Sequence, residues 1–225
     1  MKNRKRISLF LAVLMLICAL CGCSDKGGNT DGKTDDGNNA LSLGIIEGNV
    51  YTNQYVGLSC KLGSNWTYKT AEELQDLPDD ISNMMSGSAL GDAISRYNTL
   101  IDMQAENLQD LTSINVVYTK LPSSERAMYA KMTESEVIDS ILAQKDMLIA
   151  SYKQMGITVH SMKKVTVTFM GEEHTAMHMT ADISGIAYYT LQFSYMHLGE
   201  YGATVTLASY QTDKTDSLLP IFSKA

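Results

Sequence analysis

The sequence has little proline, tryptophan or cysteine: its 225 residues include three prolines, one tryptophan and four cysteines. So few prolines exclude a proline-rich stalk. Hydrophobic residues form 44% of the chain and charged residues 19%, which excludes a disordered or collagen-like protein. The Gly-x-Ser-x-Gly element of hydrolases and the dinucleotide fingerprint are also absent. Because no catalytic signature is visible, we predict a folded protein that is not an enzyme.

The sequence has no apolar run long enough to cross a bilayer. The longest, residues 7–20, falls short of the roughly 20 residues that a spanning helix needs. Because a basic stretch precedes this run, it predicts a secretory signal peptide over residues 1–22. The run ends in Leu20-Cys21-Gly22-Cys23, which resembles the lipobox of bacterial lipoproteins. The resemblance implies a diacylglyceryl group on Cys23, with Cys21 as the competing acceptor.

Positive charge is scarce in the mature chain. Four of the 18 lysines and arginines lie in residues 1–22, which leaves 14 against 25 acidic residues and a net charge of −11. A chain this acidic repels nucleic acid and anionic lipid headgroups, so we expect neither as a direct partner. Attachment to the membrane then depends on the acyl chains at Cys23. We predict a protein on the extracytoplasmic face of the cell membrane, with another envelope protein as a candidate partner.

The mature chain divides into a linker and one domain. Residues 23–48 are rich in Gly, Asp, Asn, Lys and Thr and contain no aromatic side chain, which predicts a lipidated N-terminus followed by a flexible linker. Residues 49–225 carry globular patterning, and their number is sufficient for one well-formed core.

Cysteine chemistry is also limited. Three of the four cysteines lie in residues 1–23, so Cys60 is the last free thiol and no intramolecular disulfide is expected. Alternation places Cys60 on one strand face with Leu58 and Leu62. We therefore predict that Cys60 is a buried structural thiol and not a nucleophile.

Capping and alternation signals predict strand pairs separated by helices. Thr70 and Glu73 have capping-box spacing at the start of a helix through Leu77, and a second short helix is expected over 78–85. Thr133 and Glu136 have the same spacing at the start of a long helix that ends at Met155, with Gly156 as its C-terminal cap. Expected strands are 49–51, 54–62, 97–106, 114–121, 157–161, 163–169, 174–183, 187–197 and 203–210, before a short helix over 216–222. Because the last strands are joined by short connections, they must form an antiparallel meander. The predicted fold is α+β: an antiparallel sheet flanked by helices in an α-β-α sandwich.

Several of these motifs resemble a known family. Tyr51-x-Asn53-x-x-Val56-Gly57-Leu58, Leu62-x-x-x-Trp66 and the helix start Thr70-Ala71-Glu72-Glu73-Leu74 are similar to the opening of PsbP-like domains found in lipoproteins of Gram-positive bacteria. The strands around Ile101-Asp102-Met103 and Ile114-Asn115-Val116 fit the same order of elements. The resemblance implies an α-β-α sandwich with a binding or scaffolding role, no conserved catalytic site and service as an accessory subunit of larger assemblies.

The hairpin around Ile183-Ser184-Gly185 carries the candidate site. A three-residue turn with Gly in the left-handed position would set Met179 opposite Tyr189 and His178 opposite Thr190, so that apolar and polar residues take separate faces. We predict that ligand binding uses the polar side of this hairpin.

The candidate ligand-binding residues are His174, His178, Tyr188 and Thr190, with Tyr188 as the best exposed aromatic residue. Residues four apart in a strand are separated by about 13 Å, so the two histidines cannot bind one metal ion directly. We therefore expect no metal and no cofactor.

The sequence thus predicts a membrane-anchored lipoprotein with a non-catalytic binding or accessory-subunit domain. Two alternatives stay open. One is a small-ligand or metal-binding lipoprotein that uses the polar sheet face around His174, His178 and Thr190. The other is a cell-wall hydrolase.

Overall fold

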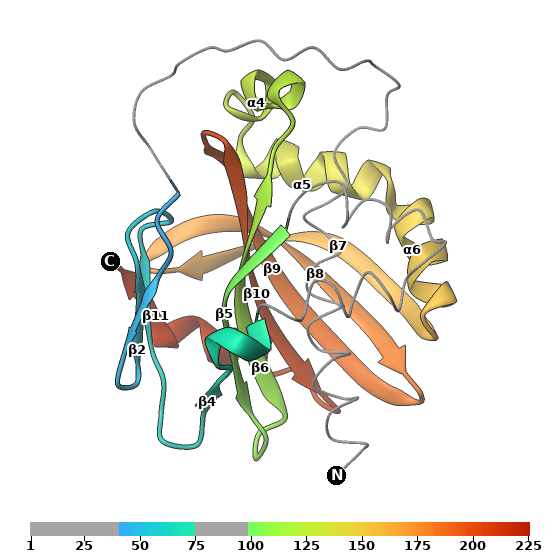
Figure 1. Cartoon of the computed structure of the whole chain (residues 1–225). Coiled ribbons are helices and arrows are strands. Elements are labelled where there is room, and N and C mark those ends of the chain that lie inside the picture. Colours follow the sequence, from blue (N-terminus) through green and yellow to red (C-terminus); the bar gives the residue numbers. More distant parts are fainter. Residues whose placement is uncertain (1–40, 75–98) are drawn as a thin grey trace.

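Two antiparallel sheets form the body of the protein. A computed structural model describes residues 41–74 and 99–225 (Figure 1). The large sheet has the order β4 (Thr67–Tyr68), β5 (Thr99–Asn107), β6 (Thr112–Lys120), β10 (Tyr201–Tyr210), β9 (Ile186–Leu198), β8 (Glu172–Ile183) and β7 (Ile157–Phe169). The small sheet has the order β1 (Ile45–Glu47), β2 (Val50–Asn53), β3 (Leu58–Lys61) and β11 (Phe222–Lys224). The predicted meander is confirmed, because β7 to β10 are neighbours in chain order.

The two faces of the large sheet have different covers. One face carries α4 (Ser123–Tyr129), α5 (Glu134–Ala143) and α6 (Lys145–Gln154), whose apolar residues share a core with Met177 and Met179 of β8. The other face packs against the small sheet, α7 (Thr215–Leu218) and the 3-10 helix η2 (Leu219–Ile221). The predicted α+β class, with helices flanking an antiparallel sheet, is confirmed. On the second face most of the cover comes from the small sheet rather than from helices.

The predicted helix from Glu134 to Met155 is two helices. Its capping box is confirmed, because Glu136 N–H donates to the Thr133 hydroxyl and the Glu136 carboxylate accepts from Thr133 N–H. The break falls at Gln144, whose φ of −100° and ψ of 14° leave the helical region. Gly156 ends α6 with a φ of +77°, as its predicted cap role requires.

The hairpin register predicted between β8 and β9 is wrong by one residue. Ser184 and Gly185 have φ values of +52° and +80°, so they form a two-residue turn that pairs Ile183 with Ile186. Positive φ at both central residues gives a turn whose twist matches the strands that it joins. As a result His178 lies opposite Leu191, and not opposite Thr190.

The end of the β7–β8 hairpin that carries its turn, between Phe169 and Glu172, diverges from the large sheet (Figure 1). β8 pairs with β9 only as far as Met177, while its pairing with β7 continues to Glu172. Phe169 at this end packs on the small-sheet side, with its ring stacked on Phe193 at 4.1 Å and 5.2 Å from Phe222. The two sheets are therefore joined by aromatic packing at this end.

A buried polar cluster joins the sheets a second time. Asp102 lies where the β5–β6 register shifts, so a β-bulge directs its side chain toward the small sheet. Its Oδ2 accepts hydrogen bonds of 2.6 Å from both the Tyr51 hydroxyl and Asn53 Nδ2, and Gly44 N–H donates to the same carboxylate at 3.0 Å. Asn53 Nδ2 also lies 2.6 Å from the Tyr118 hydroxyl. Burial, and next the charge of Asp102, raises the pKa of Tyr51, so its hydroxyl stays a donor.

The folded part begins earlier than predicted. Residues 45–47, at the end of the predicted linker, form β1 and pair with β2. Thr67 and Tyr68 form a separate strand, β4, which pairs with β5. Cys23, the signal peptide and the helices predicted between residues 75 and 98 lie outside the described residues. Within the described ranges, no helix has the length and apolar character needed to cross a membrane.

Candidate functional site

His174 on β8 is paired with the carboxylate of Glu134. Its Nδ1 lies 2.8 Å from Oε1 of Glu134, the first residue of α5. The second oxygen of Glu134 accepts a hydrogen bond of 2.9 Å from the backbone N–H of Thr175. This contact lies beyond Met177, the last residue of β8 that pairs with β9. Glu134 therefore attaches the start of α5 to the diverging end of β8.

His178 is held in the same way by the segment before α7. Its Nε2 lies 2.8 Å from Oδ2 of Asp213, and Oδ1 of Asp213 accepts from the N–H and hydroxyl of Thr215 at 3.0 and 2.7 Å. Partial burial acts to raise the pKa of Asp213, but the hydrogen bonds from Thr215 and His178 outweigh it. The carboxyl therefore titrates below its ordinary value of 3.8.

We expect Asp213→Asn to remove an acid-sensitive contribution to stability. A carboxyl with a lowered pKa stabilises the folded state above its ordinary value, and this contribution is lost as the pH falls through the folded-state pKa. At pH 7 the variant should lose about 0.5–1 kcal/mol, since the group is partly solvated. Urea unfolding at pH 7 and pH 3 should show the two proteins converging at the lower pH. A deficit of equal size at both pH values would contradict this origin.

The two histidines do not form one site. The remaining ring nitrogens, Nε2 of His174 and Nδ1 of His178, are buried and have no hydrogen-bond partner in the part of the chain that the structure describes. Their carboxylates belong to different elements, α5 and the segment before α7. Among residues 41–74 and 99–225, no group of three or more His, Cys, Asp and Glu could hold a metal ion.

Tyr188 and Thr190 lie on the opposite face of the sheet from the histidines. Thr190 is paired with Met179 and Tyr188 with Ala181, and both partners belong to the core beneath the helices. Tyr188 is 0% exposed, so its predicted exposure is wrong. The one-residue register difference is the cause, because it moves every β9 side chain to the other face relative to β8. The four predicted residues are therefore not brought together.

Thr190 belongs instead to a set of polar residues that lie in neighbouring rows across the large sheet. The sequence analysis missed this set. The central row consists of Gln104 in β5, Asn115 in β6, Thr206 in β10 and Gln192 in β9. Residues directly opposite in antiparallel strands point to the same face. The row continues to Met177 in the core under α5 and α6, so this is the helix-covered face.

Flanking rows enlarge this set on both sides. The row on one side of the central row holds Thr190 together with the pair Glu106 and Ser113. The row on the other side holds the pair Thr204 and Ser194. We call the nine residues the polar face, and none is more than 8% exposed. They are Gln104, Glu106, Ser113, Asn115, Thr190, Gln192, Ser194, Thr204 and Thr206.

Many groups of the polar face have no hydrogen-bond partner among the described residues. Both side-chain polar atoms of Asn115 are in this state, and so are the hydroxyls of Ser113, Ser194, Thr204 and Thr206. Burying such groups without partners costs free energy, and native proteins hold only a few of them. Their concentration on one covered patch makes this patch the candidate binding site.

Two tyrosines border the polar face. Tyr188 and Tyr210 pair across β9 and β10, one row beyond Thr190, with ring centroids 4.7 Å apart. Burial, and next the charge of Glu106, raises the pKa of Tyr210, so its hydroxyl stays protonated.

The signal for the polar face was present in the sequence. The strands contain the alternating polar positions Ser113-x-Asn115, Thr204-x-Thr206 and Thr190-x-Gln192-x-Ser194. Alternation of this kind is typical of a strand with one solvent-facing side. Three neighbouring strands with the same pattern would have indicated a common polar surface, but only the tertiary structure shows that it is covered.

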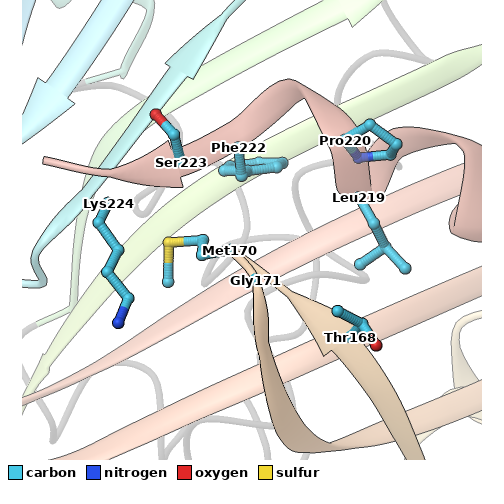
Figure 2. A pocket seen from close by; sticks show the side chains of 8 residues that line it. All are labelled: Thr168, Met170, Gly171, Leu219, Pro220, Phe222, Ser223 and Lys224. Atoms are coloured by element: carbon cyan, nitrogen blue, oxygen red, sulfur yellow. The ribbon is translucent and has the colours of Figure 1, made fainter.

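A groove at the C-terminal end of the chain is a separate feature (Figure 2). Its volume is about 460 Å³. Met170 and Phe222 give it an apolar lining, and Lys224 at its edge forms an ion pair with Glu172. The lining residues are Thr168, Met170, Gly171, Leu219, Pro220, Phe222, Ser223 and Lys224. None of them belongs to the polar face.

The thiol of Cys60 offers no reactive site. Cys60 is 1% exposed, which confirms its predicted burial, and this burial raises the pKa of its thiol to about 11. Gly27 to Thr34 fits the Gly-x-x-x-x-Gly-Lys-Thr spacing of phosphate loops, but it lies outside the described residues. A phosphate loop follows a strand and opens a helix in an α/β fold, whereas the sheets described here are antiparallel.

Comparison with known proteins gives limited information. No protein-family model matches this chain, and no curated protein matches it. Among solved structures, the chain is similar to the solution structure of cyanobacterial PsbP (CyanoP) from Synechocystis sp. PCC 6803. The two share 9% sequence identity with a TM-score of 0.42, over 85% of this chain and 98% of that one. Function is therefore inferred from the site.

Proposed function

We propose that this chain is a lipoprotein on the extracytoplasmic face of the cell membrane, and that its folded domain is a non-catalytic binding or accessory module. The observation that carries the binding role is the polar face, where buried amide and hydroxyl groups lack partners among the described residues. These groups lie on central strands of a seven-stranded sheet, which is a rigid support for a binding site. The anchor rests on the lipobox that ends at Cys23.

The chemistry of the site favours binding over catalysis. The polar face contains hydroxyls but neither histidine nor cysteine, so its serines and threonines have no adjacent base of the kind that activates a nucleophile. Both histidines of β8 lie on the opposite face and are engaged by carboxylates. The thiol of Cys60 is buried and its raised pKa disfavours the thiolate.

The anchor is tested by substitution of each candidate cysteine. In cells fed an alkyne-tagged fatty acid, we expect Cys23→Ser to abolish labelling and to remove the protein from the fraction extracted only by detergent. Cys21→Ser is the matched control, because it lies two residues away and should keep both the label and the membrane location. Labelled protein in the Cys23→Ser variant would overturn the proposed anchor.

The binding role is tested without assuming a ligand. Native mass spectrometry of the full chain, purified in detergent from its host, should show an added small molecule of constant mass. Asn115→Leu should lose this adduct, because leucine has a similar volume but no hydrogen-bonding atoms. Thr166→Val on the exposed face of β7 should retain it. A wild-type chain without any adduct, or an adduct kept in Asn115→Leu, would overturn the assigned site.

A further inference from the structure

We propose that the groove beside β11 is a docking site for an extended peptide of a partner protein, with apolar and basic residues in alternation. This inference goes beyond the proposed function, because the groove and the polar face have no residue in common. It rests on three properties of the groove: the strand edge that borders it, its apolar floor and its acidic rim.

The groove opens between two sheet edges. β11 is the last strand of the small sheet and β7 the last strand of the large sheet, and no strand of the described ranges pairs with the outer side of either. The lining comes from β11, from η2 and from the turn that follows β7 (Figure 2). The side chains of Lys224 and Glu172 at its edge are 58% and 62% exposed, so the groove is open to solvent.

The backbone of β11 presents hydrogen-bonding groups on its free side. Ala225 N–H donates to the Gly57 carbonyl at 3.1 Å, so Ala225 and the alternate residue Ser223 bond to β3. Phe222 and Lys224 then direct their backbone groups away from β3. Phe222 N–H closes η2, so the free side offers the Phe222 carbonyl and both backbone groups of Lys224. An extended peptide can pair with such an edge by β-strand addition.

The floor of the groove suits apolar side chains of such a peptide. Met170 and Phe222 form the floor, and Leu219 and Pro220 of η2 line one end of the groove (Figure 2). Phe222 is 5% exposed and its ring packs on Phe169, which holds the floor in place. Successive side chains of an extended chain point to opposite sides. Every second residue of the peptide would therefore contact the floor, and these residues should be apolar.

The rim of the groove is acidic. Glu172 and Glu173 are both exposed at the start of β8, and Glu173 lies opposite the lining residue Thr168. Lys224 is paired with Glu172, whereas Glu173 forms no ion pair with any residue that the structure describes. Because the predicted mature chain is also acidic, it attracts a basic peptide and repels an acidic one. The peptide residues between the apolar ones should therefore be lysine or arginine.

The shape of the groove favours a single strand over a second copy of this chain. The β7–β8 turn stands beside β11, and the two are joined by the ion pair of Lys224 with Glu172. A second folded domain brought to the β11 edge would meet this turn. One extended strand needs only about 5 Å of space beside β11.

The first experiment measures fluorescence anisotropy with two end-labelled peptides, Lys-Val-Lys-Val-Lys-Val-amide and its counterpart with glutamate in place of lysine. The full chain is held in phosphatidylcholine nanodiscs, and empty nanodiscs correct for binding to lipid. We expect the lysine peptide to bind, and the glutamate peptide to bind at least about 10-fold more weakly. Failure of the lysine peptide to bind, or equal binding of both peptides, would overturn the proposal.

Two variants of one residue separate backbone pairing from side-chain contacts. Lys224→Pro removes an N–H that faces the free edge and leaves the hydrogen bonds to β3 in place, so it should weaken binding about 10-fold. Lys224→Ala is the matched control, because it loses the same ion pair but keeps the N–H. It should bind at least as tightly as wild type, since it makes the rim more acidic. Equal affinities of the two variants would overturn strand pairing.

Modified peptides give the same test without altering the protein. One version of the lysine peptide carries N-methyl groups on its valines, and the other carries them on its lysines. Only alternate amides of a strand face its neighbour, so one version should bind about 10-fold more weakly than the other. Equal affinities of the two versions would contradict pairing with β11.

Other occupants, and failure of the proposed function, give different results. A dimer of the full chain that Lys224→Pro dissociates would assign the edge to a second copy, and saturable binding of laurate without binding of the peptide would assign the groove to a lipid. Either result overturns the peptide. Asn115→Leu, on the polar face, should bind the lysine peptide as wild type does. If the peptide binds but no small-molecule adduct is found, the groove is supported and the polar-face site fails.

Discussion

Asp102→Ala should lower the free energy of unfolding by about 3 kcal/mol, one of the two largest effects that we expect from a single substitution. The carboxylate accepts hydrogen bonds from Tyr51, Asn53 and Gly44. Tyr51 and Asn53 belong to β2 of the small sheet, and Gly44 directly precedes β1 of the same sheet. Alanine would leave the buried Tyr51 hydroxyl and Asn53 amide without their charged acceptor. Urea unfolding of the purified chain at pH 7 measures the loss.

Two variants make this prediction specific. Asp102→Asn keeps the shape and one acceptor oxygen but removes the charge, so we expect a smaller loss than with alanine. Asp182→Ala is the control, because Asp182 pairs with His160 on the surface and both side chains are at least 40% exposed. It should change stability by no more than about 0.5 kcal/mol. A loss below about 1 kcal/mol for Asp102→Ala would show that the bulge carboxylate does not hold the sheets together.

Phe169→Ala should have an effect of at least similar size, about 3–5 kcal/mol. Phe169 is 0% exposed and packs between the ring of Phe193 in the large sheet and that of Phe222 in the small sheet. The outer end of the β7–β8 hairpin no longer pairs with β9, so aromatic packing replaces strand pairing there. Removal of the ring would leave a cavity between the two sheets.

Hydrogen exchange can locate this effect. With Phe169→Ala, amides of residues 165–175 should lose protection before those in the paired part of the meander, because their contacts with the rest of the fold depend on this ring. Leu108→Ala is the control, since Leu108 is 64% exposed and touches no core. It should leave both the stability and the exchange pattern unchanged. Uniform loss of protection across the chain would contradict a local role for Phe169.

Much of the fold could be predicted because its signals are local. The capping boxes at Thr70 and Thr133, the left-handed Gly156 and the consecutive strands after it all follow from neighbouring residues. The same holds for the burial of Cys60 with Leu58 and Leu62, because a short alternating strand has one obvious apolar face.

The candidate site was harder to predict, for two reasons. Ser184 and Gly185 both take positive φ, and this choice of turn shifts the register by one residue and separates Thr190 from His178. Alternation also identifies two faces of a strand without saying which one is covered. Tyr188 was therefore expected at the surface, although tertiary packing covers it.

The sequence by itself determined the α+β class, the antiparallel meander, the helix starts and the expectation of a lipid-anchored chain, since each depends on composition or on residues close together in the chain. Only the tertiary structure decided which side chains meet. It brought Asn115, Thr206 and Gln192 into one row and directed Asp102 toward the small sheet. Both results depend on strand register and on a bulge, and these are fixed by packing between segments far apart in the sequence.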